Sequence, residues 1–310
     1  MNPAVKLALR AARAIVVPYR RFEFLASLGL YDSLSDEEFI RRMYKSFMGR
    51  EIDLDNPKTL CEKLNWLKLH DRRPEYTLMA DKYAVKSYVA ERIGAEHVVP
   101  LLGVWDSFDE IDFDALPEQF VLKCTHDSGG VAVCRDKSTF DRKLARKILE
   151  KSLARNYSLL YREWAYKNVP RRIIAEQYIP TLGRSDSVEF KITCLNGIAK
   201  LNTICRGPAH TFAWKRTNDH YDRDMKRLKF YVAYKNPEPP EKIPPQMHEI
   251  MTMSEKLSAG IPYVRVDWYI SEGRIYFGEF TFYTWGGFMR FNPPEWDEIL
   301  GSWLELPAKV

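Results

Sequence analysis

The sequence has few of the features that mark secreted, membrane-spanning or zinc-ribbon proteins. Its five cysteines are odd in number, and none lies in a Cys-x-x-Cys pair. That pattern argues against a disulfide framework or a zinc ribbon and favours the reduced thiols of a cytoplasmic protein. No apolar run approaches the roughly 18–20 residues that a transmembrane helix requires. We therefore expect a cytoplasmic protein with no membrane-spanning segment.

Several catalytic signatures are also missing. The sequence contains no Gly-Lys-Ser/Thr ending of a Walker A loop, no Gly-x-Ser-x-Gly turn and no His-Glu-x-x-His zinc motif. The net charge of +5 is mild, its charges are spread along the chain, and no nucleic-acid motif is recognisable. This balance suits an anionic substrate or a membrane surface, and we expect no nucleic-acid partner.

The chain is long enough to bury a sizeable core. Its 310 residues allow one large domain or two to three lobes. The first hundred residues are expected to be mainly helical. Capping signals open helices at Ser35 and Thr59, and a third helix is expected over 78–92, ended by Gly94.

The N-terminal segment 1–29 is basic and amphipathic. Lys6, Arg10 and Arg13 alternate with apolar residues at helical spacing. The segment is too polar for a signal peptide and lacks a clean cleavage site. We expect a helix that packs on the body of the protein or, as the alternative, makes peripheral contact with anionic lipid.

From about residue 97 the pattern changes to short strands. A hairpin is expected over 187–206 because Asn196-Gly197 is a strong turn signal. The stretch 207–246 is long and Pro-rich, and is expected to form a loop, lid or linker. Further strands are predicted at 97–105, 119–125, 131–136, 171–180 and 264–282, with helices at 139–154 and 247–258. The pattern predicts an α+β protein.

The last strand pair carries two acids. Asp267 and Glu279 face each other if the connecting loop has three residues, 272–274, whereas a two-residue loop would send them to opposite faces. Facing carboxylates repel each other and need a cation, and Mg²⁺ commonly takes one or two carboxylates plus phosphate oxygens. Arg265 alongside could then neutralise phosphate charge. The alternative is a solvated polar face with an arginine salt bridge.

A lysine and a glycine loop stand together in the run 120–131. The strand 120–124 delivers Lys123, and Ser128, Gly129 and Gly130 follow in a short loop. Glycine lets the backbone approach a phosphate closely, and loop N–H groups bind anions. A lysine on an apolar strand needs an anionic partner. The alternative is a β-hairpin with an incidental lysine.

Two further strands lead into polar residues. The apolar run 173–175 reaches a polar hinge at Glu176–Ile179, whose backbone groups could meet an adenine edge. In 187–194, Glu189 and Lys191 alternate with apolar residues and therefore share a face. The alternatives are a buried strand with a turn and a half-exposed strand with a charge pair.

Taken together these elements resemble the ATP-grasp superfamily and, more closely, its TupA-like branch, named for teichuronopeptide biosynthesis. The resemblance covers about residues 55–305. The matching stretches are LCEKLNWLKLHD, MADKYAVKSYV, LP-x-x-FVLKCTHDSGG, IIAEQYI, FKITCLNG and VRVDWY…IYFGEFTF…GG. It implies an α+β fold in which two lobes grip Mg-ATP, with a helical N-terminal region over 1–95, a small lobe over 96–180 and a C-terminal lobe over 181–310.

The resemblance also implies roles for single residues. Lys123 and, less directly, Lys82 resemble lysines that contact ATP phosphates, and Ser128, Gly129 and Gly130 resemble the loop that covers them. Adenine would meet the hinge formed by Glu176, Gln177, Tyr178 and Ile179. Glu189 would reach the ribose and Lys191 would add a second basic group. Asp267, Glu279 and Thr281 resemble magnesium ligands, with Arg265 stabilising the phosphoryl group in transfer.

Three departures from the family pattern stand out. Glu279-Phe280-Thr281 replaces the common Glu-x-Asn, Glu189-Phe190-Lys191 replaces Asp-Tyr-Lys, and the N-terminal domain is short and helical. The implied activity is an ATP-dependent carboxylate–amine ligase that acts through an acyl phosphate on small-molecule or glycan-linked substrates, in cell-surface polysaccharide or peptide-glycan biosynthesis. The alternatives are a phosphotransferase acting on a sugar hydroxyl and a non-catalytic nucleotide-binding scaffold.

Overall fold

A computed structural model describes residues 18–180, 187–207 and 216–308 of the chain. The predicted basic N-terminal helix with Lys6, Arg10 and Arg13 lies outside these ranges. None of the described helices is both long enough and apolar enough to cross a membrane.

The N-terminal third of the described chain is helical, and its helices begin and end where the sequence signals them. Ser35 caps α3 through its hydroxyl, and Thr59 and Glu62 form a reciprocal capping box at the start of α4. Gly49 ends α3 with a φ of 76°. The helices are α2 (Pro18–Ser27), α3 (Asp36–Met48), α4 (Leu60–His70), α5 (Glu75–Ala80) and α6 (Val85–Ile93).

The helix predicted over 78–92 is wrong, because α5 and α6 are separated at 81–84. The Asp81 carboxylate accepts the Tyr83 N–H at 2.8 Å and pairs with Arg172 at 3.1 Å, while the Lys82 N–H donates to the Thr125 carbonyl at 3.2 Å. These tertiary bonds replace the bonds of a continuous helix. Gly94 ends α6 as expected.

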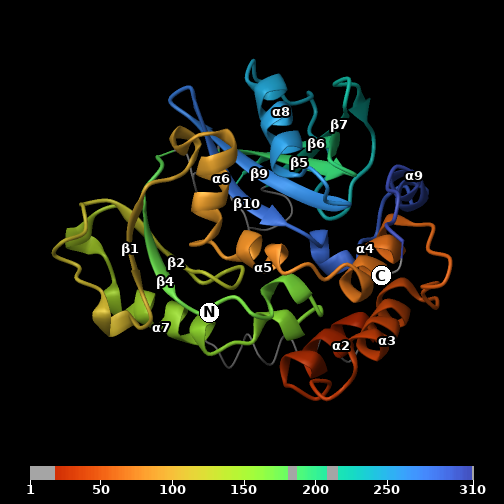
Figure 1. Cartoon of the computed structure of the whole chain (residues 1–310), viewed down its shortest axis with the longest axis horizontal. Helices are drawn as coiled ribbons and strands as arrows, with labels where there is room; N and C mark the ends of the chain where they lie inside the picture. Colours follow the sequence, from red (N-terminus) through yellow and green to blue (C-terminus); the bar gives the residue numbers. More distant parts are fainter. Residues whose placement is uncertain (1–17, 181–186, 208–215, 309–310) are drawn as a thin grey trace.

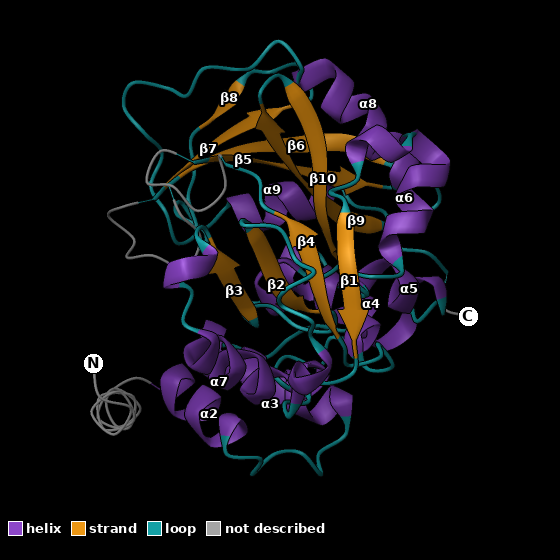
Figure 2. Ribbon diagram, turned by 90° about the vertical axis from the view of Figure 1, so that its left-hand side faces the viewer, coloured by secondary structure: helices purple, strands orange, loops and turns teal. Residues whose placement is uncertain are grey.

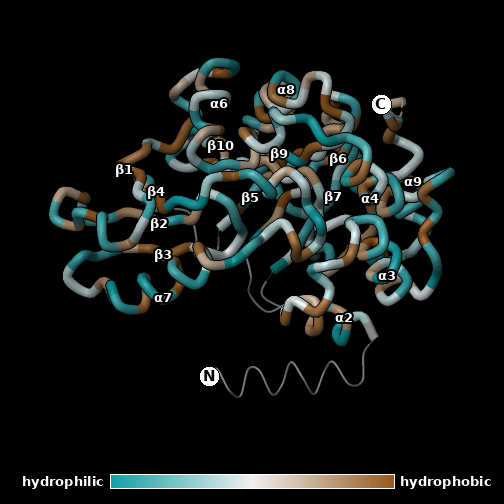
Figure 3. The backbone as a smooth tube through the Cα atoms, turned by 60° about the horizontal axis from the view of Figure 1, so that its bottom comes forward, coloured by the Kyte–Doolittle hydropathy of each residue, from teal (hydrophilic) through white to brown (hydrophobic). Residues whose placement is uncertain are grey.

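The first sheet, called the small sheet below, has four antiparallel strands in the order β1-β4-β2-β3. Its apolar face packs against α7 (Arg142–Leu153) through Phe120, Leu122 and Leu149. The strands are β1 (Leu101–Trp105), β2 (Phe120–Cys124), β3 (Val131–Cys134) and β4 (Ile173–Gln177). In Figure 3, α7 is largely hydrophilic, as expected of a helix that buries one narrow stripe.

The second sheet, the large sheet, has six antiparallel strands in the order β10-β9-β5-β6-β7-β8. Figures 1 and 2 show it beside the small sheet, with α8 (Met247–Leu257) packed on it. The strands are β5 (Val188–Leu195), β6 (Ile198–Arg206), β7 (Thr217–Asp222), β8 (Arg227–Leu228), β9 (Tyr263–Ser271) and β10 (Arg274–Thr281). The Asn196-Gly197 hairpin is confirmed, with both turn residues at positive φ.

The loop predicted over 207–246 is wrong in part, because it contains β7 and β8. The polar sequence of β7 concealed it. Asp219 is fully buried, yet Arg227 pairs with it at 2.7 Å and the Tyr221 hydroxyl donates to it at 2.8 Å. These partners let an acidic residue occupy a strand interior.

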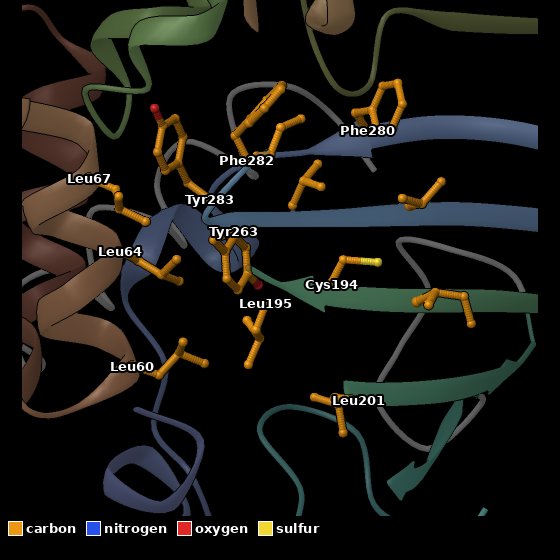
Figure 4. Packing of buried hydrophobic residues seen from close by; sticks show 14 of the residues in the cluster. Leu60, Leu64, Leu67, Cys194, Leu195, Leu201, Tyr263, Phe280, Phe282 and Tyr283 are labelled. Carbon is orange, nitrogen blue, oxygen red and sulfur yellow. The ribbon is translucent and has the colours of Figure 1, made fainter. Parts of the chain in front are cut away.

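The N-terminal helices share one core with the large sheet. Figure 4 shows Leu60, Leu64 and Leu67 of α4 beside Leu195 and Tyr263 of the large sheet. The Asp297 carboxylate, on α9 (Trp296–Ser302), accepts the backbone N–H of Cys61 at 2.9 Å. The helical region is therefore fixed to α9, near the C-terminal end of the described chain.

Candidate functional site

A glycine bulge brings the two predicted acids together. The turn between β9 and β10 has two residues, Glu272 and Gly273, because Ser271 pairs with Arg274. The structure thus has the two-residue alternative, and this turn alone would place Asp267 and Glu279 on opposite faces. The register shifts by one residue at Gly278, however, so that Glu279 pairs with Asp267 and Thr281 with Arg265. The acids therefore share a face.

The shared face carries a row of charged side chains across three neighbouring strands. Glu279 on β10 pairs with Asp267 on β9, which pairs with Lys191 on β5. The Lys191 Nζ lies 2.6 Å from an Asp267 carboxylate oxygen. We call Glu279, Asp267, Lys191 and the adjacent Arg265 the charged row.

Two cations hold Asp267 in its ionised form. Arg265 donates to its two carboxylate oxygens at 2.6 and 2.7 Å, and Lys191 donates to one of them. Burial alone would raise the pKa of Asp267, which is 2% exposed, but Arg265 and Lys191 outweigh burial and hold that pKa below its usual value. The carboxylate stays negative at neutral pH and offers further lone pairs to a cation.

The other two predicted metal ligands, Glu279 and Thr281, differ in whether their oxygens already have a hydrogen-bond partner. The Glu279 side chain is 37% exposed, and its nearest cation is Lys82 at 4.0 Å. The Thr281 hydroxyl accepts a hydrogen bond from Arg265 at 2.9 Å. Within the described ranges, no three His, Cys, Asp or Glu side chains converge on one point. Two carboxylates, those of Asp267 and Glu279, are therefore available as metal ligands. Two carboxylate ligands fit a Mg²⁺ ion whose other ligands are phosphate oxygens.

Lys82 connects the charged row to the small sheet. Its Nζ donates to the Asp127 carbonyl at 2.5 Å and faces Glu279. Asp127 belongs to the loop 125–130 between β2 and β3. In that loop Gly129 has a φ of 116°, and a Cβ on Gly130 would lie 2.2 Å from the Ser152 hydroxyl. The loop thus needs both glycines, and Ser128 on it is exposed.

Lys123 lies on the face of the small sheet opposite to α7. Its Nζ pairs with Glu176 at 2.5 Å, and Lys86 on α6 pairs with the second oxygen of Glu176 at 2.6 Å. Burial would raise the pKa of Glu176, but the two lysines hold it at about 2. Lys86 is a member of this cluster that the sequence did not single out. It lies in the first turn of α6, whereas Lys82 stands before that helix begins.

The predicted hinge follows directly on β4. Gln177 donates its N–H to the Pro100 carbonyl at 3.0 Å. The main-chain groups of Tyr178 and Ile179 have no backbone partner in the part of the chain described here. Gln177 and Tyr178 also border a cavity of about 700 Å³. Unpaired main-chain groups at this point suit a planar heterocycle with donors and acceptors along its edge.

Glu189 and Lys191 share a face, as expected. Lys191 lies 3.3 Å and Arg216 lies 2.8 Å from the same Glu189 oxygen. Burial favours a higher pKa for Glu189, yet Lys191 and Arg216 lower it below its usual value. Glu189 is thus ionised and tied to the charged row through Lys191.

Two buried charges near the row were missed by sequence reasoning. Glu163 is 6% exposed and Lys68 is fully buried. Burial raises the pKa of Glu163 and lowers that of Lys68, each to about 7. Among the charges that act on Glu163, Lys68 acts most strongly, followed by Arg265 and Glu279. The signal in the sequence was an acid inside the aromatic run Tyr157–Tyr166, where an unpaired charge is unexpected.

Two antiparallel sheets carry the clustered lysines and carboxylates, and the glycine loop joins β2 to β3. The chain belongs to the TupA-like ATP-grasp family, whose model matches residues 62–305. That match confirms the ATP-grasp fold and the α+β class expected from the sequence. No curated protein matches the chain significantly.

Solved structures with a similar arrangement include two ligases. A D-alanine–D-alanine ligase from Bacillus anthracis is 17% identical, with a TM-score of 0.37 over 71% of this chain and 58% of that one. An L-amino acid ligase from Bacillus licheniformis is 14% identical, with a TM-score of 0.44 over 82% of this chain and 56% of that one. This chain thus spans less than two thirds of either structure, and the family match alone carries the assignment.

Proposed function

We propose that this protein is an ATP-dependent carboxylate–amine ligase that works through an acyl phosphate. The observation that carries the proposal is the charged row, in which Asp267 and Glu279 stand beside Arg265 and Lys191 and meet the glycine loop through Lys82. Family membership supplies the expectation of ATP as the phosphoryl donor. We further propose that the enzyme is cytoplasmic and serves cell-surface polysaccharide or peptide-glycan biosynthesis.

The triphosphate would lie between the two sheets. Lys123 and Lys82 would bind its oxygens, and the N–H groups of Ser128, Gly129 and Gly130 would cover it. Adenine would meet the main-chain groups of Tyr178 and Ile179. Glu176 positions Lys123 at 2.5 Å, and this ion pair has to loosen for the lysine to reach a phosphate.

Asp267 and Glu279 would hold Mg²⁺, because hard carboxylate oxygens on neighbouring strands suit it and the phosphates would complete its coordination. The bound ion would neutralise charge on the β- and γ-phosphates. Asp267 already faces two cations, so its position is fixed before any ligand arrives. Glu279 is half-exposed and is the more adjustable of the two.

The reaction requires two transfers. An oxygen of the substrate carboxylate attacks the γ-phosphorus, the bond to the β-phosphate oxygen breaks, and ADP leaves. Arg265 and Lys191 would stabilise the charge that spreads over the transferring group, which is an electrostatic role. An amine then attacks the acyl carbon and displaces phosphate, giving an amide.

The function is tested with hydroxylamine as a general amine. The protein, Mg-ATP and a panel of amino acids and uronic acids are incubated with hydroxylamine, and ADP and hydroxamate are measured. We expect one carboxylate class to give both products in equal amounts. A phospho-sugar formed without any amine would identify a phosphotransferase instead, and the absence of ADP with every carboxylate would contradict both activities.

Replacing Lys123 by alanine is expected to weaken ATP binding roughly tenfold to a hundredfold. The loss corresponds to one charge-assisted contact of about 1.5–3 kcal/mol. Lys86→Ala is the matched comparison, since Lys86, on α6, pairs with the other oxygen of the same Glu176 and its side chain is 14% exposed. Calorimetric titration with Mg-ATP measures the ATP affinity of both variants. An unchanged affinity in Lys123→Ala would remove this lysine from the nucleotide site.

A further inference from the structure

The charged row is continued by polar side chains on two further strands of the large sheet. Lys191 on β5 pairs with Thr203 on β6, and Thr203 pairs with His220 on β7. Residues that stand directly opposite each other on antiparallel strands share a face, so Thr203 and His220 lie on the same face as Asp267. The His220 Nδ1 lies 2.9 Å from the Thr203 hydroxyl oxygen, which shows that the two side chains meet.

Two buried polar atoms at this end of the row have no partner. The His220 Nε2 and the Asn218 Oδ1 make no hydrogen bond within the described ranges. Asn218 precedes His220 by two residues on a strand that pairs with β6 without a bulge, so both side chains point to the same face. Asp219, on the other face of β7, is by contrast paired with Arg227 and Tyr221. Unpartnered buried atoms are costly unless water or a ligand satisfies them.

Packing fixes the direction of the His220 ring. The residue is 6% exposed, and its ring stacks on Phe230 with 4.2 Å between centroids and 9° between planes. Phe230 stacks in turn on Trp296 of α9 at 4.7 Å. Burial lowers the pKa of His220 to about 4, so the ring is neutral at neutral pH. A neutral imidazole beside an amide oxygen suits an uncharged polar group.

The charges along the row indicate how a substrate would lie. Arg265 and Lys191 attract a carboxylate to one end, and Lys191 gives only two of its three donors to Asp267 and Glu189 among the described residues. From Asp267 to His220 the row crosses the strands β9, β5, β6 and β7. That distance is about 14 Å at roughly 4.8 Å per strand. A substrate whose carboxylate reacts beside Arg265 would thus extend toward His220.

We propose that His220 and Asn218 form a subsite that binds a hydroxyl group of the carboxylate substrate, an assignment that rests on the ligase function proposed above. A hydroxyl both donates and accepts, so it can donate to the Asn218 oxygen and can pair with the His220 Nε2 in either tautomer. An alkyl group in the same place would leave both atoms unpaired and is therefore rejected. Both atoms are covered as they stand, so the substrate reaches them through a local opening of this face.

The test compares two acids of equal chain length. Gluconate carries a hydroxyl on every carbon beyond its carboxylate, so it presents one wherever the subsite requires it, whereas hexanoate carries none. Hydroxamate formation from Mg-ATP and hydroxylamine gives kcat/KM for each acid. We expect the wild type to prefer gluconate by at least about tenfold.

His220→Phe keeps an aromatic ring against Phe230 but loses both ring nitrogens. We expect the preference for gluconate to fall to within about threefold in this variant, through a higher KM for gluconate rather than a lower kcat. Asn218→Leu removes the second polar atom at similar volume and should reduce the preference in the same way. His248→Phe, the same substitution at an exposed position of α8, is the matched control and should keep the wild-type preference.

Each outcome decides for or against the subsite. A wild type without a preference, or a preference retained in either His220→Phe or Asn218→Leu, would overturn the inference. An equal loss of activity with both acids, carried by kcat, would show a structural role and would overturn it as well. So would a wild type that forms hydroxamate from other acids but none from gluconate. No hydroxamate and no ADP with any carboxylate would instead contradict the ligase function itself. Thermal unfolding checks that each variant folds.

Discussion

Replacing Asp267 by asparagine is expected to lower ATP turnover by at least about 10²-fold, the size of effect seen when a preorganised charge-stabilising group is removed. The substitution removes a proposed metal ligand and leaves Arg265 and Lys191 without their shared anion. Because the broken ion pairs are buried, we also expect a loss of about 3–5 kcal/mol in the free energy of unfolding.

Glu279→Gln separates these two effects. The Glu279 side chain is 37% exposed and its nearest cation is 4.0 Å away, so its loss should leave stability nearly unchanged while turnover falls as in Asp267→Asn. Asp106→Asn, on the surface of the small lobe, is the control. ADP release and thermal unfolding are measured for each variant. Wild-type turnover in both Asp267→Asn and Glu279→Gln would contradict the metal assignment.

Gly278→Ala is expected to disturb the charged row without altering any charged side chain. A Cβ at this position would lie 2.7 Å from the Tyr269 ring and 3.0 Å from the Asp267 carbonyl. Overpacking of this kind typically costs about 1–3 kcal/mol of stability. If β10 relieves it by losing the bulge, its side chains from Glu279 onward exchange faces and turnover falls sharply.

The control for this substitution is Gly260→Ala. Gly260 has a φ of 77° with nothing within 4 Å of an added Cβ, so alanine there adds backbone strain but no clash. We expect a modest loss of stability and normal turnover. Thermal unfolding and ADP release are the measurements. A Gly278→Ala enzyme as active as wild type would show that the row tolerates a change of register.

The bulge at Gly278 also shows what could and could not be predicted from the sequence alone. From strand alternation alone, Asp267 and Glu279 share a face only if the loop between the strands has three residues. The true turn has two residues, and Gly278 supplies the missing shift. A lone glycine inside a strand signals a bulge or a close approach. Read in that way, Gly278 would have resolved the two alternatives.

Other features depended on contacts between distant segments. The contact of the Lys82 Nζ with the Asp127 carbonyl, which joins the helical region to the glycine loop, links residues 45 positions apart. The strand β7 is polar because Arg227 and Tyr221 satisfy its buried Asp219, which no local pattern reveals. The helix caps at Ser35 and Thr59 and the Asn196-Gly197 turn, by contrast, are local and were predictable.

Glu163 is another residue whose environment could not be predicted from the local sequence. It lies in an aromatic run to which the sequence analysis assigned no role, and only the fold buries its side chain. The roles of Lys123, Glu176 and Glu189 stay predictions. The structure places each beside oppositely charged partners, which hold Glu176 and Glu189 in their ionised forms.

The most direct measurement is the affinity for ATP with and without magnesium. In the proposed site, Lys123 and Lys82 bind the nucleotide on one side. Asp267 and Glu279 bind it on the other side through a metal ion, so tight binding requires the lysines and the metal together. Calorimetric titration of the full chain should show tight binding of Mg-ATP and a loss of at least tenfold when the metal is chelated. Equal affinity in both conditions, or no binding of Mg-ATP at all, would contradict the account.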